Sequence, residues 1–117
     1  KGRDSTYCLK AQSARWIALL RENLDMAAEL SGISLEEYLN DKKLVLVFEA
    51  LVLRVGELAK RLAESEGLAG EPWSSAAKAR DVVAHHYHRI DSVALFETVK
   101  RSFPQLRRAL CELEQSG

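Results

Sequence analysis

The stretch DKKLVLVFEALVLRVGELAKRLAESEG, residues 41–67, decides the fold class. Its apolar side chains recur every three or four residues for about five turns, which is the spacing of one helical face and too long for an ordinary β-strand. We therefore predict a helix from a capping residue, Asp41, to about Glu66. Because the first half is apolar nearly all round, we expect this helix to be central and buried. The periodic positions are Leu44, Phe48, Leu51, Val55, Leu58 and Leu62.

Two further helices are predicted before this stretch. The segment from about Thr6 to Leu30 has the same three- and four-residue spacing, and Gly32 ends it. Ser34 stands three residues before Glu37, which is the arrangement of a capping box. The sequence therefore predicts a long first helix and a short second one.

After the long helix, the loop GLAGEP at residues 67–72 makes the clearest break in the chain. Pro72 suits the first turn of a helix, and we expect that helix to run to about Ile90, with Trp73 as its anchor. The end of this helix is marked by Asp91 and Ser92, which can cap the next helix.

The last helix carries an apolar seam from Phe96 to Leu113 that Pro104 interrupts. Ser102 and Gln105 have the spacing of a second capping box, so we expect a restart or a kink at the proline. With 117 residues there is room for one hydrophobic core. We predict a single all-α domain over residues 1–117, a bundle of four to five helices.

The composition limits the classes of function. Because 17 basic residues balance 17 acidic ones, broad adhesion to nucleic acid is disfavoured, and RNA contact must come from a local basic cluster. Cys8 and Cys111 lack the spacing of a zinc site or a disulfide scaffold. No apolar run reaches the roughly 18 residues that cross a bilayer, and the first residues lack a signal-peptide core. We expect a cytoplasmic protein with no membrane association.

Chemistry-bearing side chains gather near the end of the predicted helix at 72–90, where all three histidines of the chain fall within four positions. The histidine side chain titrates at about pH 6.5 and therefore exchanges protons at cellular pH. The arginine side chain offers a planar set of N–H donors for phosphate oxygens. RNA contains its own nucleophile, the 2′-hydroxyl, so these groups suffice for cleavage without a metal. The cluster consists of Arg80, Asp81, His85, His86, Tyr87, His88, Arg89 and Asp91.

A single regular helix does not bring this cluster together. Arg80 and Tyr87 are seven residues apart and share a stripe, whereas His85 lies about 140° round from Arg80. A symmetric dimer that apposes two such helices would bring both pairs of Arg80 and His85 into one composite cleft. We therefore expect a homodimer.

The string Arg80, four residues, His85, one residue, Tyr87 resembles the motif of HEPN ribonucleases. Its flanks agree with the HepT toxins, which are encoded beside MntA-type nucleotidyltransferase antitoxins. The flanks are EALVLRVGELAKRL at 49–62, Pro72-Trp73, YHRID at 87–91 and Phe103-Pro104-Gln105-Leu106. One difference is Asp81, where this family more often has Asn.

The resemblance implies a homodimeric HEPN-like helical bundle that acts as the toxin of a type II toxin-antitoxin system. It implies a metal-independent endoribonuclease with no cofactor, in which Arg80 holds or polarises the scissile phosphate and His85 is the general acid or base. It also implies that Tyr87 receives AMP from ATP through the cognate nucleotidyltransferase, which neutralises the toxin. Asp81, His86 and Glu57 are candidate supporting residues.

Other interpretations of these residues remain open at this stage. Arg80 can be a surface residue in a salt bridge with Asp81 or Glu71, and Tyr87 can pack its ring at an interface. His86 and His88 can be exposed or face a dimer partner, and His85 with His88 has a helical spacing that a metal can use. Glu49 and Glu57 either mark the exposed face of the long helix or face Arg80.

The same fold can also serve as a non-catalytic module that binds a nucleotide or a nucleotidyltransferase partner. This alternative function belongs to a different class, because it requires no chemistry at Arg80 or His85.

Overall fold

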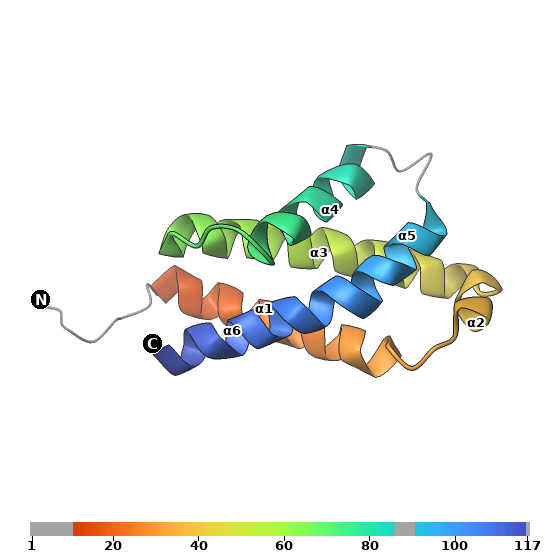
Figure 1. Cartoon of the computed structure of the whole chain (residues 1–117), viewed down its shortest axis with the longest axis horizontal. Helices are drawn as coiled ribbons and strands as arrows, with labels where there is room; N and C mark the ends of the chain where they lie inside the picture. Colours follow the sequence, from red (N-terminus) through yellow and green to blue (C-terminus); the bar gives the residue numbers. More distant parts are fainter. Residues whose placement is uncertain (1–10, 86–90, 117) are drawn as a thin grey trace, which may run out of the picture.

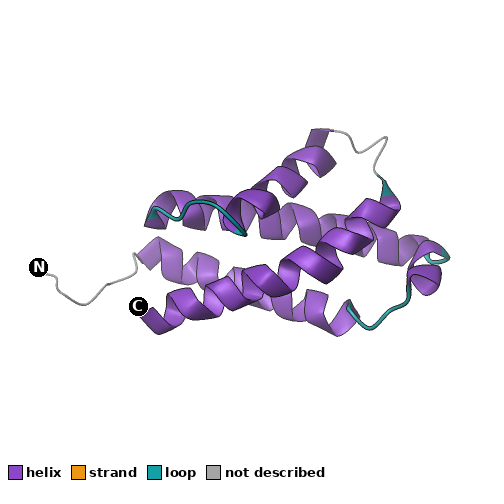
Figure 2. Ribbon diagram, viewed as in Figure 1, coloured by secondary structure: helices purple, strands orange, loops and turns teal. Residues whose placement is uncertain are grey.

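A computed structural model describes residues 11–85 and 91–116 of the chain. Figure 2 shows helices and loops and no strand in this described part, so the predicted all-α fold is confirmed. Figure 1 shows α1, α3 and α6 running lengthwise beside one another, with α4 against α3. The elements are α1 (Ala11–Leu30), α2 (Leu35–Leu39), α3 (Lys42–Glu66), α4 (Trp73–His85), α5 (Ser92–Glu97), the π-helical turn η2 (Thr98–Ser102) and α6 (Phe103–Ser116).

The long helix α3 is the central element, and both of its predicted ends are confirmed. The Asp41 side chain accepts a hydrogen bond from the backbone N–H of Lys43 at 2.9 Å, which caps the helix. Gly67 ends it with φ 68°, a left-handed conformation that glycine adopts without steric cost. Helix α3 packs against α1, α2, α4 and α5, and supplies Phe48, Leu51, Val52, Val55, Ala59 and Leu62 to the core.

The expectation that the first half of α3 is buried is wrong for its first six residues. None of the residues 42–47 is buried, and the side chain of Leu46 is 63% exposed. The short helices α2 and α5 both pack on α3, and Leu44 and Val45 are partly buried against the core while Leu46 and Val47 are exposed. Among the residues that the structure describes, this apolar surface has no partner.

Helix α1 runs antiparallel to α3. The buried Ser13 hydroxyl, near the start of α1, lies 2.9 Å from the Ser65 hydroxyl and donates to the Glu66 carboxylate at 2.5 Å. These contacts fix the start of α1 at the end of α3. The predicted part of this helix before Ala11, with Cys8, lies outside the described residues.

The predicted capping box of α2 is confirmed. The backbone N–H of Glu37 donates to the Ser34 hydroxyl at 3.1 Å, and the N–H of Ser34 donates to the Glu37 carboxylate at 3.2 Å. Behind it, the Tyr38 hydroxyl donates to the backbone oxygen of Ser92 at 2.8 Å. Burial, with the nearby charges of Glu49 and Asp91, raises the pKa of Tyr38 to about 12. The phenol therefore stays neutral and joins α2 to the start of α5.

Helix α4 begins where the proline predicts. The carbonyl of Pro72 accepts from the N–H of Ala76 at 3.2 Å, and the Glu71 carboxylate accepts from the N–H of Ser75 at 3.1 Å. Trp73 is buried at 7% exposure, which agrees with an anchoring role. The last five residues of the predicted helix, 86–90, lie outside the described part of the chain.

The segment after α4 starts as predicted but passes Pro104 differently. Asp91 caps α5, accepting from the N–H groups of Val93 at 3.0 Å and Ala94 at 3.2 Å. Of the two expectations, a restart or a kink, the restart with a capping box at residues 102–105 is wrong, because α5, η2 and α6 form one continuous helical path. The departure from a regular α-helix lies just before the proline, in η2. The N–H of Phe103 bonds to the carbonyl of Thr98, five residues back. This wider turn accommodates the proline, which has no N–H to donate.

Candidate active site

Arg80 makes two ion pairs, and the one with Glu57 joins α4 to α3. Its Nη2 lies 3.2 Å from Oε1 of Glu57, and its Nη1 lies 3.0 Å from Oδ1 of Asp81. The arginine side chain is 30% exposed, so its guanidinium is held in place and still open to solvent. A guanidinium has five N–H donors, and these pairs leave donors for a phosphate oxygen.

Gly56 allows α4 to approach α3 closely at this point. A Cβ atom at Gly56 would lie 2.2 Å from the Cβ of Arg80 and 2.7 Å from the backbone oxygen of Ala76. Both distances are far below van der Waals contact. Because Gly56 has no side chain, α4 lies close enough to α3 for Arg80 to reach Glu57.

His85 is exposed in the last turn of α4, and its Nδ1 lies 2.8 Å from the backbone oxygen of Asp81. Because a carbonyl oxygen can only accept, this hydrogen bond requires the proton on Nδ1. In the neutral ring Nε2 is then the nitrogen with a free lone pair. This is the protonation state in which His85 can take a proton from a substrate hydroxyl.

Asp81 connects the two candidate catalytic residues. Its carboxylate pairs with Arg80, and its backbone oxygen receives the His85 ring. A carboxylate at this position also competes with a phosphate for Nη1 of the arginine. Asp81 can thus orient both groups, and its negative charge weakens phosphate binding.

Glu57 faces Arg80, which answers the question that its sequence position left open. Its Oε2 accepts from Nε of Arg61 at 2.8 Å while Oε1 pairs with Arg80. The hydrogen bond from Arg61 has the largest effect on the pKa of Glu57 and lowers it. Burial opposes this effect, and the charges of Arg80, Arg61 and Lys60 add to it, so the pKa lies below its ordinary value. The carboxylate is therefore ionised at neutral pH and holds both arginines.

Sequence reasoning missed two residues of this arrangement, Gly56 and Arg61. The four-residue spacing of Glu57 and Arg61 was a usable signal for their pair. His86, Tyr87 and His88 lie outside the described residues. Among residues 11–85 and 91–116, no group of three metal-ligating side chains comes together.

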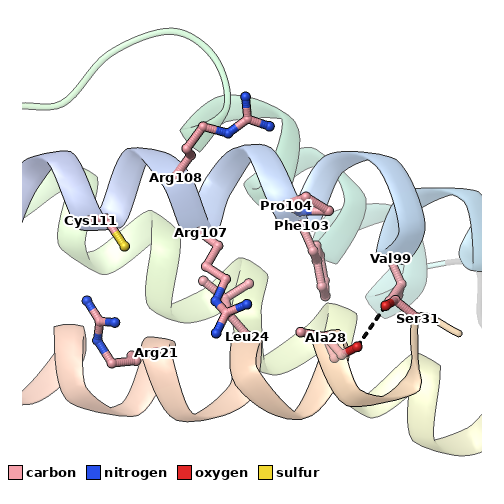
Figure 3. A pocket seen from close by; sticks show the side chains of 11 residues that line it. Arg21, Leu24, Ala28, Ser31, Val99, Phe103, Pro104, Arg107, Arg108 and Cys111 are labelled. Carbon is pink, nitrogen blue, oxygen red and sulfur yellow. Dashed lines mark hydrogen bonds between the residues drawn. The ribbon is translucent and has the colours of Figure 1, made fainter.

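An arginine-lined groove of about 550 Å³ lies away from Arg80, between α1 and α6 (Figure 3). Arg107 pairs there with Asp25 at 2.6 Å, and Arg21 pairs with Glu114. The described residues that line this groove include no histidine, so it lacks an acid-base group beside its arginines. We therefore place the candidate active site at Arg80.

Helices that cross a bilayer need a long apolar stretch. No helix in the described residues is both long and apolar enough to do so.

The protein is an all-α bundle whose candidate site lies on one helix. An arginine of that helix is suited to bind a phosphate, and a histidine is suited to move a proton. A family model described as Ribonuclease HepT-like matches residues 20–113. The chain belongs to this family of HEPN ribonucleases.

One curated relative and the solved structures complete the comparison. The chain is 27% identical over 99 residues to a protein named "Putative RNase TTE0752" from Caldanaerobacter subterraneus subsp. tengcongensis. This match covers 83% of the chain and 88% of that protein. No solved structure matches the chain.

Proposed function

We propose that this chain is a metal-independent endoribonuclease and the toxin of a type II toxin-antitoxin system, with Arg80 and His85 as its catalytic residues. The observation that carries the proposal is the pair of contacts at Asp81. One residue fixes the guanidinium of Arg80 through its carboxylate and the ring of His85 through its carbonyl. Membership of a ribonuclease family supports RNA as the substrate.

The proposed reaction uses the 2′-hydroxyl of RNA as the nucleophile. Nε2 of His85 takes the hydroxyl proton, the 2′-oxygen bonds to phosphorus, and the bond from phosphorus to the 5′-oxygen breaks. The leaving 5′-oxygen regains a proton from the imidazolium or from water. Arg80 stabilises the extra negative charge on the phosphate oxygens, which is the largest contribution in many such sites.

The active form in this proposal is a homodimer. Arg80 points to α3, whereas His85 is exposed at the end of α4, so a second copy can complete a cleft that one helix leaves open. Exposed apolar side chains on α1 and α3 support a partner: Leu19 is 42%, Met26 50% and Leu46 63% exposed. Sedimentation of the active enzyme as a monomer would contradict this part of the proposal.

The purified chain should cleave single-stranded RNA in the presence of EDTA, because none of the proposed steps requires a metal. The measurement is the appearance of internal cleavage products on a denaturing gel, with heat-treated protein as control. The competing function is a non-catalytic module that binds a nucleotide or a nucleotidyltransferase. No cleavage under any condition, with no growth defect on expression and no effect of Arg80→Ala, would favour that alternative.

Tyr87 is proposed as the site where a cognate MntA-type nucleotidyltransferase antitoxin adds AMP from ATP. A bulky anionic nucleotide there would occupy the cleft and pair with Arg80, which blocks RNA without a long-range change. Incubation with ATP and the partner should raise the intact mass by whole AMP units, and Tyr87→Phe should abolish the rise. Modification that persists in Tyr87→Phe would refute the site.

A further inference from the structure

A pocket of about 550 Å³ lies between α1 and α3, directly beside the candidate active site. Trp16 and Gln12 of α1 line one side, and Lys60, Arg61 and Glu64 are among the α3 residues that line the other. The volume falls in the range of pockets that hold small ligands. The proposed reaction at Arg80 and His85 does not use this pocket.

A single carboxylate connects the pocket to Arg80. Glu57 lines the pocket, and its two oxygens point to different arginines: Oε1 lies 3.2 Å from Nη2 of Arg80 and Oε2 2.8 Å from Nε of Arg61. Arg61 is itself a pocket residue. A ligand whose phosphate binds Arg80 is therefore separated from the pocket only by the side chain of Glu57.

The α3 face that carries this pocket changes character at Glu57. Towards the start of α3, the same face presents Leu46, Ala50 and Leu53, at helical steps of three and four residues. Towards its end, the face presents Lys60, Arg61 and Glu64. The apolar half fits a protein partner, and the polar half with the pocket fits a ligand that is both aromatic and charged.

The side chains in the pocket suit a nucleobase. Trp16 is partly exposed, so its indole ring is available for stacking. The amide of Gln12 and the carboxylate of Glu64 can bond to the polar edge of a base, since carboxylates accept from exocyclic amino groups. Lys60 is exposed on the same side and suits a backbone phosphate.

We propose that this pocket is a subsite for one base of single-stranded RNA, next to the nucleotide whose phosphate Arg80 binds. The inference rests on the proposed ribonuclease function and adds to it a substrate class. A base inside a duplex is stacked on its neighbours and cannot enter the pocket, whereas an unpaired base can be splayed onto an aromatic ring. The subsite therefore selects single-stranded segments.

Binding can be measured without cleavage in the His85→Ala variant, with an RNA of ten unpaired nucleotides (roughly the span of a single-strand site). Tryptophan fluorescence reports on the pocket, because Trp73 is buried at 7% exposure and Trp16 is partly exposed. We expect the RNA to quench this emission. Trp16→Leu should weaken binding about 5- to 150-fold, which corresponds to one stacked base, and Trp16→Phe should keep most of the affinity.

Two controls separate stacking from charge. A blunt duplex of the same sequence should bind without quenching Trp16. Lys60→Ala should weaken binding more than Arg108→Ala, a matched loss of one exposed basic side chain that lines the groove between α1 and α6. Circular dichroism confirms that each variant is folded, and quenching in the chain with Trp16 intact gives an answer even if Trp16→Leu does not fold.

The outcomes for the subsite and for the enzyme can be told apart. Cleavage of RNA by the wild-type chain, with unchanged affinity in Trp16→Leu or with no quenching, overturns the subsite and leaves the proposed ribonuclease intact. Equal cleavage by wild type and His85→Ala overturns the proposed mechanism, whatever Trp16 does. Weaker binding in Trp16→Leu together with a raised KM and an unchanged kcat supports the subsite.

Discussion

Replacement of His85 by alanine is expected to lower the rate of RNA cleavage by about 10²- to 10⁴-fold, the usual contribution of a positioned acid-base group. The ring holds its proton on Nδ1, bonded to the Asp81 carbonyl, and offers Nε2 to the substrate. Alanine supplies no proton acceptor. Initial rates on a defined single-stranded RNA, with EDTA present, measure the loss.

The stability of this variant should change little, which separates a catalytic effect from misfolding. His85 is exposed, its contact is one hydrogen bond within its own helix, and alanine is a strong helix former. Urea denaturation should give a free energy of unfolding within about 1 kcal/mol of wild type. Lys78→Ala, at another exposed position of α4, is the matched control and should retain full activity. Wild-type cleavage by His85→Ala would remove the proposed mechanism.

The same variant tests whether the cleft is shared between two copies. His85→Ala and Arg80→Ala chains are each expected to be inactive. If one copy supplies Arg80 and the other His85, an unfolded and refolded equal mixture should regain about a quarter of wild-type activity, because half of the dimers are mixed and each of these keeps one of its two Arg80–His85 pairs intact. A mixture that stays inactive would show that Arg80 and His85 of each working pair come from the same chain.

Local sequence signals were sufficient for both ends of α3 and for the start of α2. Asp41 and Gly67 bound α3 as expected, and the Ser34 and Glu37 capping box forms, because each cap depends on residues within a few positions of itself. Pro104 shows the limit of that reasoning. Whether a helix restarts or widens at a proline depends on how its two halves pack, and here both halves join one core through Phe96, Val99 and Phe103.

Contacts between helices were harder to predict than the helices themselves. Periodicity places Leu46 on an apolar helix, but its exposure depends on how far α2 and α5 extend over that end of α3. The pair of Arg80 and Glu57 depends on the register of α3 against α4. A sequence pattern identifies both residues as polar positions on helices and leaves that register undetermined.

Substitution of Gly56 by alanine is expected to destabilise the fold by about 1–3 kcal/mol and to reduce cleavage strongly. The added Cβ would lie 2.2 Å from the Cβ of Arg80 and 2.7 Å from the carbonyl oxygen of Ala76, neither of which is a flexible chain end. Helices α3 and α4 must separate to relieve the overlap, which draws Arg80 away from Glu57. Displacement of a catalytic group by about 1 Å can cost about 100-fold in rate.

The sign of the change in stability distinguishes this steric effect from an ordinary helix substitution. In an open helix, alanine in place of glycine stabilises by about 1 kcal/mol. Gly32→Ala, in the turn after α1, is the control for replacing a glycine without steric overlap, since a Cβ there meets nothing within 4 Å, and it should stabilise slightly and leave cleavage unchanged. Urea denaturation measures the change in the free energy of unfolding for both variants. A Gly56→Ala variant that is more stable than wild type would contradict the close approach of α3 and α4.

A double-mutant cycle then assigns the loss of activity to Arg80. If Gly56 acts as a positioning residue, Gly56→Ala should lower kcat in the wild-type chain and have no further effect on the residual rate in an Arg80→Ala background. The cost in stability should persist in that background, because the Cβ of Arg80 and the carbonyl of Ala76 both remain. An equal fractional loss of rate in both backgrounds would mean that Gly56 supports the fold without positioning Arg80.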